Sequence, residues 1–205
     1  MCIRDRNRDT DEIYLGYSSP KTPSRVYKFN LSNKSKELVK EQEIPSGHNP
    51  ENYIVERVEF QSHDGRLVPL TITRHKKTKI DGSANLLLYG YGSYGSSMSP
   101  SFSSTRLSLI DRNIIWATAH IRGGMEKGMK WWKEGKLTNK KNTFEDYIHA
   151  GRYLIENNYT SKGKIIGMGG SAGGLLMGAV VNQSPELFLG IIMAVPFVDS
   201  LTTNL

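Results

Sequence analysis

The 205-residue sequence contains a single cysteine and no long apolar segment, and each absence excludes a class of protein. Cys2 has no partner for an internal disulfide and cannot form a metal site by itself. No apolar run approaches the roughly 20 residues that a membrane-spanning helix needs, so we expect no membrane contact. The first ten residues carry charges but lack the apolar core of a secretory signal. Unless the native N-terminus is missing, the sequence predicts a cytoplasmic protein.

Acidic residues are outnumbered by basic ones, and a basic protein can bind nucleic acid. The 27 Lys and Arg residues against 20 Asp and Glu give a formal net charge of +7. Basic residues concentrate at 74–79 and 127–141, and the second stretch also holds Trp131 and Trp132. No pattern of a known nucleic-acid-binding module is present. We therefore interpret these stretches as a solvated loop and a solvated surface helix, and predict no nucleic acid partner. A non-catalytic binding domain with a basic surface stays an alternative.

Residues 11–48 have the pattern of the end of a larger β domain. A turn is expected at 18–23, between the first two β segments, and a linker at 46–50. A three-stranded meander of this size buries too little apolar surface to be stable alone. We therefore expect a domain boundary after residue 48, with residues 49–205 forming the second domain. The three β segments are predicted at 12–17, 25–30 and 37–40.

The second domain has the alternating strands and helices of an α/β protein. Val68, Leu70 and Ile72 recur with period two, as in a strand with one buried face. Residues 143–146 resemble a capping box, which predicts a helix start. Continuous apolar strands between amphipathic helices are typical of a parallel sheet covered on both faces. Strands are expected at 58–61, 66–73, 86–89, 113–117, 164–168 and 189–195, and helices at 144–155 and 172–182.

Residues 169–173 match the G-x-S-x-G pattern between a predicted strand and a predicted helix. Such a sharp turn lifts the Ser171 hydroxyl above the carboxyl end of the sheet. It also directs the N–H of Ala172, at a helix N-terminus, toward the place where an oxyanion forms. The neighbours of the serine must lack bulky side chains. The glycines that meet this need are Gly169, Gly170 and Gly173.

Two other functions use the same residues. Gly167, Gly169 and Ala172 also fit the G-x-G-x-x-A form of a dinucleotide-binding fingerprint. That fingerprint expects an acidic residue at the end of the next strand, whereas Glu186 precedes the strand. A phosphate-binding P-loop needs a Gly-Lys-Ser/Thr sequence, which is absent here. The third interpretation is that Ser171 merely caps the following helix.

A loop rich in Tyr, Gly and Ser follows the buried strand predicted at 86–89. A flexible low-complexity tract has this composition, but its place directly after a buried strand favours a defined role. In α/β-hydrolases the loop at this position supplies the second oxyanion donor. A tyrosine hydroxyl that reached this place would donate well to a developing negative charge.

Four motifs in order resemble the prolyl oligopeptidase family of serine peptidases. They lie at 89–92, 121–124, 141–147 and 169–174, and the segments 92–95 and 195–199 are similar to its oligopeptidase B branch. The resemblance implies a partial α/β-hydrolase domain preceded by the last strands of a β-propeller. It also implies that Ser171 is the nucleophile, that Tyr91 and the Ala172 N–H form the oxyanion hole, and that no cofactor or metal is needed. The implied substrates are short peptides cut after Arg or Lys.

The sequence departs from the family pattern in its triad. In this fold the acid and then the histidine follow the nucleophile, whereas all five histidines precede Ser171. Asp199 matches a non-triad position. We therefore expect the chain to lack the triad Asp and His and to be inactive alone. The five histidines are His48, His63, His75, His120 and His149.

Two further departures concern specificity and the N-terminus. Ser99 and Ser101 stand where the oligopeptidase B branch often has acids, which leaves a dibasic preference open. Residues 1–6 fit no strand and lie outside the resemblance, so we expect them to be foreign to the native protein. Another hydrolase of the same fold, such as an esterase, remains an alternative, although the β meander before the catalytic domain weighs against it.

Overall fold

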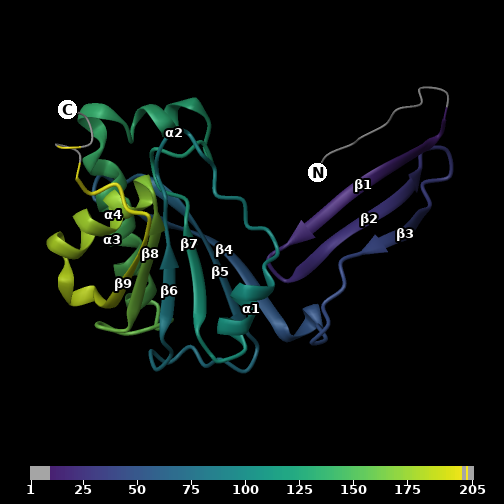
Figure 1. Ribbon diagram of the computed structural model, residues 1–205, viewed down its shortest axis with the longest axis horizontal. Helices are drawn as coiled ribbons and strands as arrows, with labels where there is room; N and C mark the ends of the chain where they lie inside the picture. Colours follow the sequence, from purple (N-terminus) through teal and green to yellow (C-terminus); the bar gives the residue numbers. More distant parts are fainter. Residues whose placement is uncertain (1–9, 200–201, 203–205) are drawn as a thin grey trace.

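The computed structural model describes residues 10–199 and 202, which form two sheets of different size (Figure 1). A small three-stranded sheet extends like an arm from a larger domain in which helices pack on a six-stranded sheet. The expectations about Cys2 and residues 1–6 lie outside the described residues. Within the described residues, no helix is both long and apolar enough to cross a membrane.

The arm is an antiparallel meander with the strand order β1-β2-β3. Its strands are β1 (Glu12–Ser19), β2 (Thr22–Asn30) and β3 (Lys36–Glu41), which confirms the three predicted strands. The turn expected at 18–23 is shorter than predicted, because β2 begins at Thr22 and includes Pro23. Every residue of β3 is exposed.

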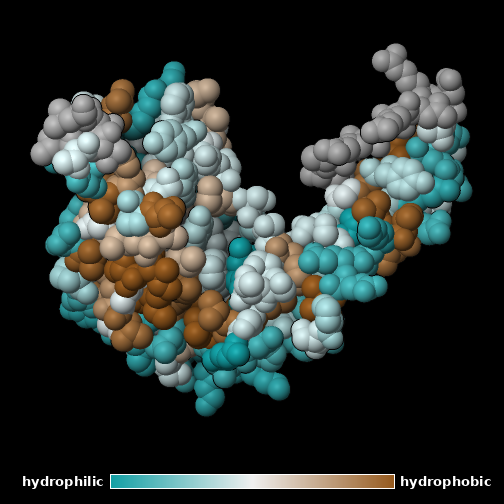
Figure 2. Space-filling view, in the orientation of Figure 1, coloured by the Kyte–Doolittle hydropathy of each residue, from teal (hydrophilic) through white to brown (hydrophobic). Residues whose placement is uncertain are grey.

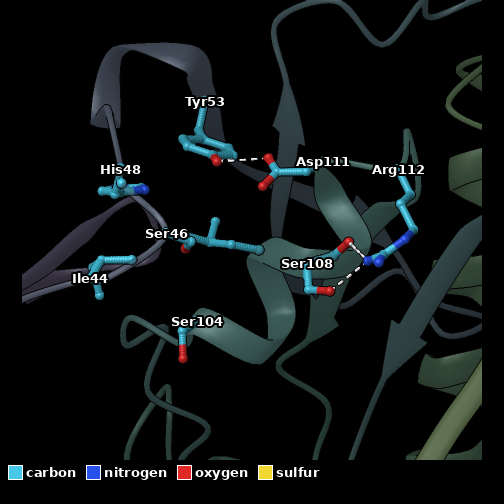
Figure 3. A pocket seen from close by; sticks show the side chains of 10 residues that line it. Ile44, Ser46, His48, Tyr53, Ser104, Ser108, Asp111 and Arg112 are labelled. Carbon is cyan, nitrogen blue, oxygen red and sulfur yellow. Dashed lines mark hydrogen bonds between the residues drawn. The ribbon is translucent and has the colours of Figure 1, made fainter.

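The arm joins the larger domain through a linker that packs on its first helix. The ring of His48 stacks on Tyr53, with 5.2 Å between ring centroids, and the Tyr53 hydroxyl donates to Asp111 over 2.7 Å. Burial first, and then this hydrogen bond, raise the pKa of Tyr53 to about 12. Figure 3 shows these side chains around a cavity of about 440 Å³, with the linker on one side and α1 (Ser104–Ile110) on the other. The linker therefore has a defined position against Tyr53 and α1.

The larger sheet has the strand order β4-β5-β7-β6-β8-β9, and its last four strands are parallel. β4 and β5 pair antiparallel on one side, and β5 is antiparallel to β7. This arrangement confirms the α/β prediction. β7 begins two residues later than expected, because Asn113 has a positive φ of 64°. The strands are β4 (Tyr53–Gln61), β5 (Leu67–His75), β6 (Leu86–Tyr89), β7 (Ile115–Ala119), β8 (Ile165–Gly170) and β9 (Phe188–Ala194).

Helices cover both faces of this sheet. Successive residues of a strand point to opposite faces, so Leu86 and Leu88 of β6 pack in a core with α3 (Lys141–Glu156) and α4 (Ala172–Gln183). Leu87 points the other way and packs with α1. The remaining short helices are α2 (Met129–Lys133), η1 (Pro50–Asn52), η2 (Leu137–Asn139) and η3 (Pro185–Leu187).

The capping box predicted at 143–146 is absent. α3 begins at Lys141, and Thr143 lies fully buried inside its first turn. The Thr143 hydroxyl donates instead to the carbonyls of Arg122 and Gly135, over 2.8 and 3.2 Å. The threonine thus joins the helix to a neighbouring loop, because its hydroxyl is directed away from the backbone of its own helix.

β9 presents apolar side chains on the molecular surface. Leu189 is 59% exposed, and Ile192 and Met193 are 44% and 43% exposed. Figure 2 shows apolar side chains gathered on the face of the molecule where β9 lies in Figure 1. Large exposed apolar patches mark interaction surfaces, ligand grooves or faces prone to aggregation.

Candidate active site

Ser171 occupies a sharp turn between β8 and α4, with a φ of 54° and a ψ of −116°. A positive φ costs energy in a residue that has a side chain, so the surroundings must hold it in place. The Ser171 N–H donates to the carbonyl of Ala194 over 2.9 Å. Its own carbonyl accepts from the N–H groups of Gly174 and Phe197, over 2.9 and 3.0 Å. These three bonds fix the turn and leave the Ser171 residue exposed.

The glycines of the motif differ in how strongly the turn requires them. A Cβ on Gly169 would lie 2.3 Å from the carbonyl oxygen of Gly173, which excludes any side chain there. A Cβ on Gly173 would lie 3.0 Å from the carbonyl oxygen of Gly90. On Gly170 the nearest atom would be the Ala194 oxygen at 3.3 Å, a tight contact that a shift of a few tenths of an ångström would relieve. The turn therefore depends most on Gly169.

The geometry disfavours both the helix-capping and the dinucleotide-binding interpretation of this motif. Ser171 is the N-cap residue of α4, but its side chain makes no capping hydrogen bond. Gly167 and Gly169 lie within β8 and not in a phosphate-binding turn, and a Cβ on Gly167 would meet the side chain of Ile191 at 2.7 Å. Glu186 lies in η3, before β9. Ser171 is exposed and its side chain does not cap the helix, so its role as a nucleophile stays a prediction that the geometry permits.

The two predicted oxyanion donors flank this turn. Ala172 is the first residue of α4, so its N–H has no acceptor within the helix. Tyr91 belongs to the loop of residues 90–95, which follows β6, and β6 is the hydrogen-bonded neighbour of β8. A Cβ on Gly173 would lie 3.3 Å from the Tyr91 ring. The ring of Tyr91 therefore packs against the first turn of α4.

Side chains of α3 pack against the end of β6 and the 90–95 loop. The buried Tyr147 hydroxyl donates to the carbonyl of Leu88 over 2.6 Å, and a Cβ on Gly90 would lie 2.7 Å from the Tyr147 ring. A Cβ on Gly92 would lie 2.3 Å from the Thr143 methyl group. These contacts explain why the loop carries glycine at both positions.

A buried ion-pair network, which the sequence did not predict, holds the loop after β7. Arg122 is 1% exposed and Asp146 of α3 is fully buried. The Asp146 carboxylate accepts from the Arg122 N–H, Nε and Nη2, over 3.0, 2.9 and 2.6 Å. It also accepts from the Ser62 hydroxyl over 2.6 Å, and Asp64 pairs with the same guanidinium. Both partners stand in motifs of the resemblance, but nothing in the sequence alone indicated that they meet.

The prediction that residues 127–141 form a solvated surface helix is wrong for several of these residues. Trp131 is 5% exposed, and its Nε1 donates to the His120 carbonyl over 3.0 Å, so it cannot act as a stacking platform. Trp132 and Lys140 instead line a mostly apolar cavity of about 500 Å³ beside Ala172. Burial lowers the pKa of Lys140 to about 8. Further lining residues are Ser93, Tyr94, Leu137, Leu175 and Phe197.

All five histidines bond to groups other than Ser171. In the described residues the Ser171 side chain has no hydrogen bond to a histidine. The cavity of Figure 3 contains His48 but lies at the amino ends of the parallel strands, the opposite edge from Ser171. The ring partners are the Lys21 carbonyl for His48, Ser62 for His63, the Lys77 N–H for His75, Thr71 for His120, and the Glu145 carbonyl for His149.

Ser99 and Ser101 lie exposed in the loop before α1. The side chain of Arg106 donates to the Ser101 carbonyl over 2.9 Å, which places a cation beside these positions. Glu126 accepts from the Met98 N–H over 2.8 Å, but its carboxylate is buried. Among residues 10–199 and 202, no group of three or more His, Cys, Asp and Glu side chains is placed to hold a metal ion.

Comparisons with known proteins cover both the arm and the larger domain. The chain is 46% identical over 197 residues to dipeptidyl aminopeptidase BI of Pseudoxanthomonas mexicana, covering 96% of this chain and 27% of that protein. It is 41% identical over 203 residues to Protease 2 of Moraxella lacunata, covering 99% and 29%. Oligopeptidase B from Leishmania major superposes with a TM-score of 0.87 at 41% identity, over 95% of this chain and 27% of that one.

The chain thus spans little more than a quarter of the length of these relatives. The sequence profile of the prolyl oligopeptidase family matches residues 100–205, more than half of the chain. That segment contains the turn at Ser171, the Arg122–Asp146 pair and all of α3. The family predicted from the four motifs is confirmed: this chain belongs to the prolyl oligopeptidase family.

Proposed function

We propose that this chain is part of a serine-type endopeptidase that hydrolyses short peptides through an acyl-enzyme on Ser171. The observation that carries the proposal is the strained, exposed turn at Ser171, whose side chain caps nothing although it stands at a helix N-terminus. In acyl transfer the serine oxygen attacks the peptide carbonyl, and the carbonyl oxygen takes up negative charge. The N–H of Ala172 and the hydroxyl of Tyr91 would donate to that oxygen. No cofactor takes part.

The general base would come from outside this chain. Alone, the Ser171 hydroxyl stays protonated at neutral pH and is a poor nucleophile. Each histidine of the chain is engaged with another group, and His120, at 1% exposed, is buried as well. A histidine and an acid elsewhere in the longer protein would complete the triad, so the chain alone would be inactive. Residual acceleration by the oxyanion donors is compatible with this assignment.

The remaining proposals concern the arm and the substrate. Residues 11–48 would form the last blade of a β-propeller, which agrees with a meander that is largely exposed by itself, and residues 49–205 the start of the catalytic domain. Cleavage after Arg or Lys is proposed by analogy with the oligopeptidase B branch. A preference for a second basic residue before the cleaved one stays open, because serines stand at 99 and 101 in place of acids and Arg106 donates to the Ser101 carbonyl.

The test is active-site labelling of the longer protein that contains this chain. A serine-reactive phosphonate should label the wild type at Ser171, and Ser171→Ala should abolish both labelling and cleavage of an Arg-containing peptide. Ser99→Ala, a matched change at another exposed serine, should leave both intact. Substantial peptide cleavage by Ser171→Ala would refute the nucleophile. Labelling together with turnover of esters but not of peptides would favour an esterase.

A further inference from the structure

The ammonium group of Lys140 forms hydrogen bonds with the loop that carries Tyr91. Its Nζ donates to the carbonyl of Gly92 over 2.6 Å and to the hydroxyl of Ser93 over 2.8 Å. Both acceptors directly follow Tyr91 in the sequence. Charged donors make the stronger class of hydrogen bond, so Lys140 is a firm tether between the start of α3 and this loop.

This tether has an energetic cost, which argues that it is more than a surface contact. Lys140 is half-buried, and this partial burial lowers the pKa of its ammonium to about 8, because it disfavours the charged form. In the described residues Lys140 has no ion pair that would offset this cost. The neighbouring Lys136 and Lys141 are themselves cations.

The other ionisable groups around Lys140 do not compensate for its charge. The ionisable residues of the 90–95 loop are Tyr91 and Tyr94, of which Tyr94 lines the cavity, and α4 contains no charged residue. Glu134, which follows α2, pairs with Arg66 and Lys130 instead. The positive charge of Lys140 is therefore directed to the carbonyl and hydroxyl of the loop.

The loop needs such a tether because its backbone is held in an unusual conformation. Gly92, Tyr94 and Gly95 all have positive φ angles, of 66°, 57° and 69°. The loop also lies so close to Gly123 that a Cβ there would come within 2.0 Å of the Gly92 oxygen. Glycine-rich segments have many accessible conformations, so a loop without its tether would sample several positions of Tyr91.

We propose that Lys140 is a positioning residue that fixes the Gly92 carbonyl and the Ser93 hydroxyl, and thereby aims the Tyr91 hydroxyl at the oxyanion. The inference rests on the proposed function for its catalytic consequence, but its structural part stands by itself. Lys140 and Ala172 line the same cavity, so the tether lies beside the first turn of α4.

The catalytic test uses Lys140→Met in the longer protein, with Lys141→Met as the matched control at an exposed neighbour. Lys140→Met should lower kcat about 10- to 100-fold with KM within about twofold, because donor misplacement acts on the transition state. Lys141→Met should change neither. An unchanged kcat, or a raised KM alone, would overturn the proposal.

A pH profile separates positioning from simple structural support. As the pH rises through about 8, Lys140 loses its proton, the tether weakens and the wild-type kcat should fall. Lys140→Arg keeps the charge at all these pH values; it should restore most of the kcat that methionine loses and should remove the fall. If the fall persists in the arginine variant, Lys140 is not its source and the proposal fails.

Hydrogen exchange tests the structural part without any activity. In residues 1–205, Lys140→Met should speed amide exchange of residues 92–95 at least about tenfold relative to Lys141→Met, since a lost tether lowers the local opening energy. Faster exchange in an inactive longer protein would refute the peptidase and keep the tether. Unchanged exchange would overturn the role of Lys140 even in an active peptidase.

Discussion

The buried carboxylate of Asp146 gives the largest stability effect that we expect from one side chain. It accepts four hydrogen bonds, three from Arg122 and one from Ser62, and both charged partners are at most 1% exposed. Removing one partner of a buried pair typically costs about 3–5 kcal/mol, because the other charge stays buried. Asp64 still pairs with Arg122 after Asp146→Ala. We therefore expect a loss near 3 kcal/mol, or about 6–12 °C in Tm for a chain of this size.

The measurement is urea and thermal unfolding of residues 1–205, with Glu145→Ala as the adjacent control. Among the residues that the structure describes, the Glu145 carboxylate pairs only with His149, at 3.8 Å on a partly exposed surface, and it should contribute less than about 1 kcal/mol. The amide N–H of Arg122 donates directly to Asp146, so its hydrogen-exchange protection should fall as well. A loss for Asp146→Ala below 1 kcal/mol, or equal to that of the control, would refute the reasoning.

Three further changes test the site and its support. Tyr91→Phe in the longer protein should lower kcat about 10²–10³-fold, the cost of one oxyanion donor, whereas a raised KM with kcat intact would assign Tyr91 to substrate binding. Gly169→Ala should destabilise the chain and abolish phosphonate labelling, since its Cβ would lie 2.3 Å from the Gly173 oxygen. Gly170→Ala, whose Cβ would lie 3.3 Å from the Ala194 oxygen, should lower the unfolding temperature less, and equal losses would contradict this difference. Burial alone would raise the pKa of Asp64, but hydrogen bonds to the buried guanidinium lower this pKa overall. The stabilisation by the Asp64 carboxylate is therefore complete above the usual pKa of aspartate, and it is lost as the pH falls through the pKa of the folded state. Asp64→Asn should flatten that acid dependence in melts recorded between about pH 2 and 5, and an unchanged slope would argue against it.

The local parts of the site could be predicted from the sequence. A β-strand, a glycine-flanked serine and a helix occur within residues 164–182, so the turn at Ser171 depends on near neighbours and its pattern is visible in the sequence. The strands of both sheets were likewise recognisable from short apolar runs. The start of α3 was not predicted correctly, because the Thr143 hydroxyl donates to the carbonyls of Arg122 and Gly135 and does not cap its own helix.

The long-range parts of the site could not be predicted in this way. Arg122 and Asp146 are 24 residues apart, and Lys140 reaches a carbonyl 48 residues away. Lys140 was predicted to lie on a solvated surface, and Asp146 was predicted to belong to a capping box, because the sequence carries no information about which distant polar groups meet on folding. A hydrogen bond between a lysine and a buried carbonyl produces no periodic pattern of residues in the sequence.

The backbone angle at Ser171 has a consequence for how variants of this chain would be ranked. A φ of 54° is unfavourable for serine and freely accessible to glycine. Ser171→Gly would therefore relieve strain of about 1–3 kcal/mol, offset by about 0.5–1 kcal/mol of glycine chain entropy, while deleting the hydroxyl. Any screen that scores folded yield or heat resistance alone would rank the glycine variant above the native sequence. Libraries built around this turn need a readout of reactivity, or they will enrich well-folded chains that lack the proposed nucleophile.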